Sequence, residues 1–284
     1  MLCACSSYPQ DLMRDGKLDV LVITGGHPFE SIPFFAMFDA DSGIEWVQAK
    51  QPAAQAFFNP RIADVWDAYL LYDLPGVEFR DGRAIATDPP PEVMRGFEEL
   101  AENGHGFVVL HHAIAGWPTW TAWGEAIGAR FHYLPGFYGG REYPDSGYRF
   151  DTWHRLTVAS PRHPVAIGLG EGFEIVDELY LFPVDEHRVT AILKSDYEFT
   201  DVNFSSAALG VAGRRGRRDG WSHPPGSNFV AWSCQYRNSE IIVIQCGDGP
   251  SAYANPGLRR LIGNSLRWVA RHRHGGPAVP YSES

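Results

Sequence analysis

The sequence lacks an apolar run long enough to cross a bilayer, and it has only four cysteines in 284 residues. No N-terminal stretch has the apolar core of a secretory signal. Neither Cys3 with Cys5 nor Cys234 with Cys246 has the spacing of a zinc ribbon or of a disulfide framework. We therefore predict a soluble, cytoplasmic protein without a membrane partner, in which Cys234 and Cys246 are buried free thiols.

Signatures for nucleotides and nucleic acids are also missing. The chain contains neither a G-x-G-x-x-G fingerprint nor a P-loop, which argues against a nucleotide cofactor. Its net charge of −10 disfavours a protein that binds phosphate backbones, so no nucleic-acid partner is expected. The basic cluster from Arg214 to Arg218 is interpreted as a solvated surface loop, because short charge clusters usually are.

What the chain does contain is enough apolar residues for a sizeable core. The apolar fraction is 44%, charged residues make up 20%, and there are nine tryptophans. No linker or internal repeat divides the chain. We expect a lead-in at residues 1–17, a single α/β domain at residues 18–271 and a tail at residues 272–284.

Apolar runs alternate with helical patterns through the first half of the chain. Strands are predicted at Leu18–Thr24, Ile44–Val47, Val65–Tyr72 and Gly106–Leu110. Helices are predicted at residues 32–39, 91–103 and 119–127. Ser31 is the expected cap of the first helix. This alternation predicts a flavodoxin-like α/β fold, with a doubly wound, mostly parallel sheet and helices on both faces.

The second half has weaker patterns. Short strands are expected at residues 155–158, 173–175, 179–182, 190–193, 228–233 and 240–246, before a last helix opened by Pro256. Residues 128–149 and 195–227 are expected to be mostly loop, and a long irregular segment in a compact domain is often functional.

Two adjacent histidines, His111 and His112, directly follow the apolar strand that begins at Gly106. In an open α/β sheet, residues just past the carboxyl end of a strand face the ligand crevice. Successive residues there diverge, so one imidazole is expected to face the site and the other to pack or to donate to a backbone carbonyl.

Other strand ends supply partners for these histidines. His27, Asp73 and Asp248 follow predicted strands, and Glu178 lies in the middle of the chain. Histidines and carboxylates together suit either acid–base chemistry or a divalent metal, and both alternatives remain open. The catalytic candidates are therefore His111, His112, His27, Asp73 and Glu178.

A metal, if held, would be zinc or manganese, with His27, His112 and His154 as the candidate ligands. Aromatic side chains offer flat faces on which a ligand ring can stack. The predicted substrate-binding residues are Trp117, Tyr138, Glu142, Trp153 and Asp248.

Several short stretches resemble the trehalose-utilisation (ThuA-like) family, which has a class I glutamine amidotransferase-like fold. The likeness runs from about Leu18 to Arg271. It is carried by Thr-Gly-Gly-His at residues 24–27, Tyr-Asp-Leu-Pro-Gly at 72–76, the strand and histidines at 106–113, Asp-Glu-Leu-Tyr at 177–180 and Gly-Asp at 247–248.

The resemblance implies that His111 stands where amidotransferases of this fold have a catalytic cysteine, so glutaminase chemistry is not expected. It also implies an enzyme of carbohydrate metabolism, a lyase, isomerase or hydrolase acting on a sugar or keto-sugar derivative. The alternative is a non-catalytic sugar-binding or assembly protein on the same fold. The expected partner is a small carbohydrate, and assembly into a homo-oligomer is left open.

Overall fold

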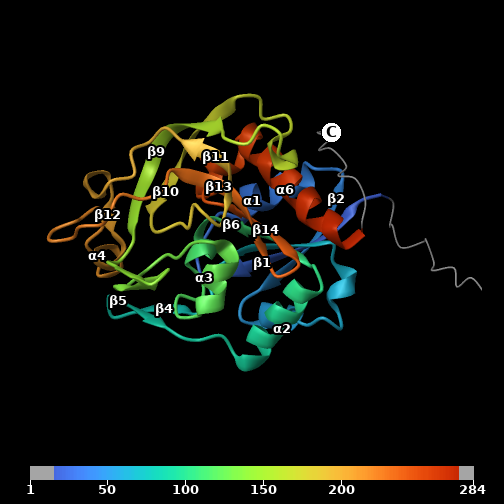
Figure 1. The fold of residues 1–284 in the computed structure, drawn as a ribbon, viewed down its shortest axis with the longest axis horizontal. Helices are drawn as coiled ribbons and strands as arrows, with labels where there is room; N and C mark the ends of the chain where they lie inside the picture. The colour runs from blue at the N-terminus through green and yellow to red at the C-terminus, as the bar shows by residue number, and fades with distance from the viewer. Residues whose placement is uncertain (1–15, 275–284) are drawn as a thin grey trace, which may run out of the picture.

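The structure of the protein is a computed structural model, and it describes residues 16–274 (Figure 1). Its centre is a parallel sheet whose strands are rich in β-branched and aromatic residues, as buried parallel strands are. The parallel strands are β2 (Ile44–Lys50), β1 (Leu18–Gly25), β3 (Ala68–Asp73), β6 (Gly106–Leu110) and β14 (Ser239–Ile244), in that spatial order.

An antiparallel extension continues the sheet beyond β14. It consists of β13 (Phe229–Tyr236), β11 (Thr190–Ser195), β9 (Gly147–Val158) and β10 (Gly172–Leu181), with β12 (Ser205–Ser206) paired to β9. The strands predicted near residues 155 and 173 are longer in the structure than expected. Polar side chains alternate with buried ones along most of β9, and this pattern conceals its length in the sequence.

Two small hairpins lie outside the main sheet and were not predicted. One pairs β4 (Val77–Arg80) with β5 (Arg83–Ala86), and the other pairs β7 (Gly136–Tyr138) with β8 (Arg141–Tyr143). The second hairpin lies in the segment that was expected to be loop.

Helices cover both faces of the sheet. Side chains of α1 (Ser31–Asp39), α5 (Gly249–Tyr253) and α6 (Pro256–His274) share one core cluster with Val20 and Val22 of β1. Side chains of α2 (Pro91–Glu102) and α3 (Thr121–Ile127) share the other with Leu21 and Ile23. The doubly wound α/β class is therefore confirmed, and α4 (Ala207–Val211) is a short addition in the segment after β11 (Figure 1).

Some local predictions need correction. Ser31 does not cap α1, because the N-cap is Glu30 and Ser31 is already helical. Val65 lies in a 3₁₀ turn ahead of β3.

Cys234 and Cys246 are buried free thiols, as predicted. The predicted lead-in and tail lie almost entirely outside the described residues. Between residues 16 and 274, no helix combines the length and apolar character that a bilayer crossing requires.

One close backbone approach brings the strand ends together. Gly26, which follows β1, has φ +84°, and a Cβ there would lie 2.3 Å from the carbonyl oxygen of Leu74, which follows β3. Only glycine fits both the conformation and the space. The loops that carry His27 and Asp73 therefore leave the sheet side by side.

Candidate functional site

The carboxyl ends of four parallel strands meet at one edge of the sheet. Gly25 pairs with Asp73 across β1 and β3, and Leu110 of β6 pairs with Ile244 of β14. The residues that follow these strands include His27, the two histidines and Asp248, as topology predicts. These strand-end residues therefore lie along one edge of the sheet, as predicted.

His111 is the centre of the site. It opens the 3₁₀ helix η3 (His111–Ala115) with φ +51° and is fully buried. A non-glycine residue in this left-handed region costs about 1–2 kcal/mol, which the surrounding packing must offset. Its Nδ1 lies 2.8 Å from the carbonyl oxygen of Gln245, so Nδ1 donates its hydrogen there and Nε2 faces the site.

Two carboxylates and a phenol surround Nε2 of His111. Glu178 Oε2 lies 3.2 Å from it, Asp248 Oδ1 3.7 Å and the hydroxyl of Tyr180 2.9 Å. Burial alone lowers the pKa of His111, but the hydrogen bond and charge of Glu178, with the charges of Asp248 and Asp177, raise it to about 9. The imidazole is therefore protonated at neutral pH and lies between two acceptors, the carbonyl oxygen of Gln245 and the carboxylate of Glu178.

A β-bulge in β9 lies opposite Glu178, the β10 carboxylate that faces this ring. Thr152 pairs with Asp177 and Arg149 pairs with Leu179, so two residues of β9, Phe150 and Asp151, stand opposite Glu178 alone. Asp151 has φ +49°, as bulge residues often have positive or otherwise irregular angles. Asp177 and Glu178 follow the regular alternation of β10 onto opposite faces, and both are buried because both faces are covered there.

Asp177 holds the loop that carries Asp248. Its carboxylate accepts hydrogen bonds from the backbone N–H of Gly247, at 2.7 Å, and of Asp248, at 2.9 Å. Burial raises the pKa of Asp177 to about 7, against the lowering effect of His111 and of these N–H groups. Asp177 therefore positions Asp248, whose side chain is the most accessible of the carboxylates around His111, with 36% of its side-chain surface exposed.

His27 and His112 form a second, neutral part of the site. Their rings stack with centroids 4.4 Å apart, and Nε2 of His112 donates to the carbonyl oxygen of Tyr72 at 3.2 Å. Burial, followed by the charge of His111, lowers the pKa of both imidazoles. Within residues 16–274, Nδ1 of each ring is buried without a hydrogen-bond partner. Nδ1 of His112 is therefore a hydrogen-bond acceptor, because Nε2 carries the hydrogen of this neutral ring.

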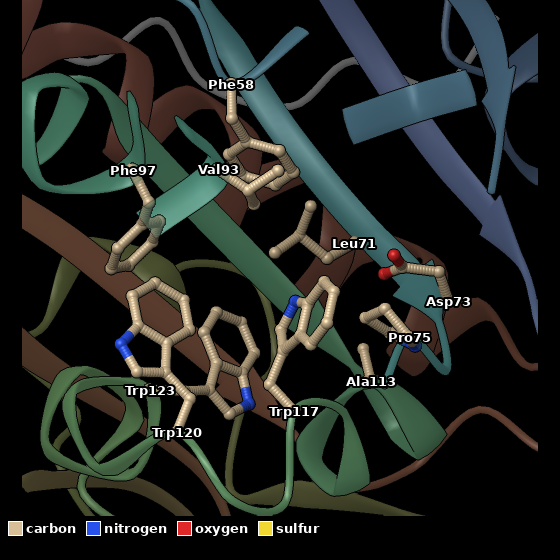
Figure 2. Close-up of a pocket in the computed structure, with 10 residues that line it drawn as sticks. All are labelled: Phe58, Leu71, Asp73, Pro75, Val93, Phe97, Ala113, Trp117, Trp120 and Trp123. Atoms are coloured by element: carbon tan, nitrogen blue, oxygen red, sulfur yellow. The ribbon is translucent and has the colours of Figure 1, made fainter. Parts of the chain in front are cut away.

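Asp73 lies at the same edge but faces another direction. Its carboxylate accepts from Nε2 of Gln51 at 2.7 Å, and burial raises its pKa to about 7. Figure 2 shows this carboxylate beside Leu71 and Pro75 at one end of an aromatic cavity. Trp117, which is only 5% exposed, also lines the cavity. The cavity has room for about one water molecule.

The other predicted residues lie apart from the His111 group. His154 is buried in β9, where its Nδ1 lies 2.8 Å from Ser195 Oγ and burial lowers its pKa to about 4. Trp153, its neighbour, is 59% exposed. Tyr138 and Glu142 belong to the β7–β8 hairpin, where Tyr138 donates to the carbonyl oxygen of Gly124.

One group of three possible metal ligands occurs in the described part of the chain. Single ligand atoms of His111, Glu178 and Asp248 all lie within 4.8 Å of one another. The predicted ligand set of His27, His112 and His154 does not form such a group. The site residues that sequence reasoning did not select are Tyr180 and Gln245; Gln245 is the polar residue that ends an apolar strand, which was an available signal.

Comparisons with known proteins agree with this architecture. A ThuA-like protein from Parabacteroides merdae matches at 15% identity over 94% of this chain and 98% of that chain, with a TM-score of 0.61. One from Bacteroides uniformis matches at 16% identity over 93% and 95%, with a TM-score of 0.59. A cytoplasmic protein from Salmonella typhimurium matches at 11% identity over 89% and 99%, with a TM-score of 0.55.

These structural likenesses show the fold alone, because the identities are low. No curated protein matches the sequence. The family model ThuA, described as trehalose utilisation, matches residues 83–269. That range includes β6 with its two histidines, β10 with Asp177 and Glu178, and the end of β14 with Asp248. The chain belongs to the ThuA trehalose-utilisation family.

Proposed function

We propose that the protein is an enzyme that acts on a sugar or keto-sugar derivative, with His111 and Glu178 as its acid–base pair. The single observation that supports this most is the position of His111 Nε2. The ring is fixed by Gln245, faces two carboxylates, and lies where ligands bind in open α/β sheets. A buried, paired imidazole at such an edge is characteristic of proton-transfer sites.

The neutral histidines support a substrate with several hydroxyl groups. Nδ1 of His112 is an acceptor, because Nε2 carries the hydrogen, and in the described residues neither it nor Nδ1 of His27 has a hydrogen-bond partner. A buried acceptor without a partner costs about 1–3 kcal/mol, so a ligand that supplies donors gains affinity there. Adjacent sugar hydroxyls are such donors. The family's link with trehalose use agrees with a carbohydrate.

The proposed chemistry is proton transfer next to a carbonyl group. The protonated His111 donates to the carbonyl oxygen of a keto-sugar while Glu178 removes a proton from the adjacent carbon, which forms an enediol. Burial raises the pKa of Glu178, although His111 opposes this, and a raised pKa makes a carboxylate a stronger base. Asp248 keeps the imidazolium charged, and no cysteine nucleophile occupies the turn after β6.

The test is solvent exchange at carbon. The purified protein is incubated in D₂O with a panel of keto-monosaccharides and keto-disaccharides, and loss of the proton next to the carbonyl is followed by ¹H NMR. We expect exchange with the native protein and at least a 100-fold lower rate with Glu178→Gln or His111→Gln, since positioned acid–base groups contribute about 10²–10⁴. Glu174→Gln, an exposed change on the same strand, serves as the matched control.

Two outcomes contradict this proposal. One is the absence of exchange with every keto-sugar, and the other is an unchanged rate in Glu178→Gln. If sugars bind but no exchange or turnover follows, a non-catalytic sugar-binding protein is the better description.

Metal-assisted chemistry is a second candidate, supported by the His111, Glu178 and Asp248 group. Ligands about 2.0–2.1 Å from a tetrahedral zinc ion stand roughly 3.3–3.4 Å apart. Nε2 of His111 lies 3.2 Å and 3.7 Å from the two carboxylate oxygens, so these residues fit zinc or manganese with a position left open. His111 would have to release its Nε2 proton to bind the ion.

Metal titration separates the two candidates. Calorimetry with Zn²⁺ and with Mn²⁺, followed by elemental analysis after dialysis, should show one bound ion that Asp248→Asn weakens strongly. Failure of either ion to bind the native protein contradicts the metal candidate and leaves the acid–base pair unaffected.

A further inference from the structure

The basic loop, Arg214 to Arg218, is fixed against the strand that carries the bulge. The backbone N–H of Gly216 donates to the hydroxyl of Tyr148 on β9 at 3.0 Å. The carbonyl oxygen of Arg217 accepts from the N–H of Ser206, which belongs to β12 and also pairs with β9. The loop is therefore anchored at one place on the sheet, although its side chains are exposed.

The arginines of this loop differ in their partners. Arg214 and Arg217 both pair with Asp219, at 2.8 Å and 2.9 Å. Arg215 has no carboxylate partner within the described residues. Its guanidinium instead lies over the ring of Phe150, with Cζ 5.8 Å from the ring centroid. Its charge is therefore available to a ligand.

Phe150 places this free cation beside the site. It is one of the two bulge residues of β9 that stand opposite Glu178. The charge of Arg215 also reaches His27, where it adds to burial and to His111 in lowering the pKa. Arg215 therefore lies against Phe150, which stands opposite Glu178, and its charge reaches His27.

We propose that Arg215 binds an anionic group, a carboxylate or a phosphate, on the sugar substrate. This rests on the proposed function and narrows its substrate to acidic or phosphorylated sugars. Guanidinium binds both groups through paired N–H donors. The protein is acidic overall, and Asp177, Glu178 and Asp248 surround His111, so an anion is repelled from the inner site and attracted to its arginine rim.

The test measures binding rather than turnover, so it is independent of whether the reaction is correctly assigned. D-Glucuronate, D-glucose 6-phosphate and methyl α-D-glucoside are titrated into the full chain at 0.15 M salt, by calorimetry. We expect at least tenfold tighter binding of one anionic sugar than of the neutral glucoside. Arg215→Ala should remove this preference and Arg215→Lys should retain part of it. The identity of the preferred anion distinguishes carboxylate from phosphate.

Arg218→Ala is the matched control, because Arg218 is exposed in the same loop and its replacement removes the same charge. It should leave the preference unchanged. The proposal is overturned if Arg215→Ala keeps the preference, if Arg218→Ala loses as much, or if neither anionic sugar binds the native protein. Failure of the carbon-exchange test with intact anion binding would instead contradict only the proposed reaction.

Discussion

Gln245 contacts His111 and Tyr180 at once. Its carbonyl oxygen lies 2.8 Å from Nδ1 of His111, and its side-chain Oε1 accepts from the backbone N–H of Tyr180 at 2.9 Å. A single residue after β14 therefore fixes the imidazole from β6 and the strand that supplies Glu178.

Replacement of Gln245 by Leu should destabilise the protein by about 1–3 kcal/mol, because the buried N–H of Tyr180 would lose its acceptor. The carbonyl that orients His111 remains. The free energy of unfolding in urea measures the effect, and Gln235→Leu, at an exposed position, is the control. Equal stability of Gln245→Leu and the native protein would show that this side chain does not hold β10.

Stability should fall as the pH rises through the pKa of His111. The folded-state pKa of about 9 exceeds the ordinary value of 6.5, so this contribution is complete below pH 6.5 and is lost as the pH passes 9. Each pKa unit corresponds to about 1.4 kcal/mol, so the full shift gives a loss of roughly 3–4 kcal/mol. Urea unfolding at pH 6.5, 8 and 9.5 should show this loss in the native protein and a smaller one in His111→Gln. Parallel pH profiles would exclude a proton bound by His111.

Replacement of Asp177 by Asn should loosen the loop at Gly247 and Asp248. Both N–H groups are bound by separate carboxylate oxygens, and an amide offers only one acceptor oxygen. We expect a loss of about 1–3 kcal/mol in unfolding free energy, with faster amide hydrogen exchange at residues 247 and 248. Unchanged exchange there would mean that the loop is held by other contacts.

A buried ion pair between α6 and the turn after α1 should contribute to the stability of the fold alone. Arg267 of α6 binds both carboxylate oxygens of Asp41 at 2.7 Å, and both side chains are almost fully buried. Asp41→Ala leaves an uncompensated charge and should cost about 3–5 kcal/mol. Glu45→Ala, which breaks the exposed pair with Lys17, should cost under about 1 kcal/mol. A similar cost for both changes would contradict this difference.

Most of the parallel half of the fold and its ligand edge are readable from the sequence, because β1, β3, β6 and β14 each contain a continuous apolar run that is followed by a polar turn. The two histidines after β6 follow from that rule. The antiparallel half is not readable in the same way. Its site residues lie on β10 beside a bulge in β9, and nothing in the sequence of β9 marks Phe150 and Asp151 as the residues that interrupt the pairing.

Side-chain direction was the other feature that the sequence could not supply. Asp73 lies at the predicted edge, yet its carboxylate binds Gln51 beside the aromatic cavity (Figure 2). His154 is predicted as a ligand by residue type alone, but its position in β9 directs Nδ1 toward Ser195. The basic loop is exposed as expected, whereas its attachment to β9 depends on contacts between residues far apart in the chain.

Asp177 and Glu178 lie on opposite faces of β10, because the residues around them alternate between the two core clusters: Ile175 and Leu179 belong to one, and Tyr180 belongs to the other. The two consecutive carboxylates therefore have separate roles. Asp177 holds the backbone at Gly247 and Asp248, while Glu178 faces the imidazole of His111. A one-residue slip of β10 against its neighbours would exchange these faces and separate both carboxylates from their partners at once.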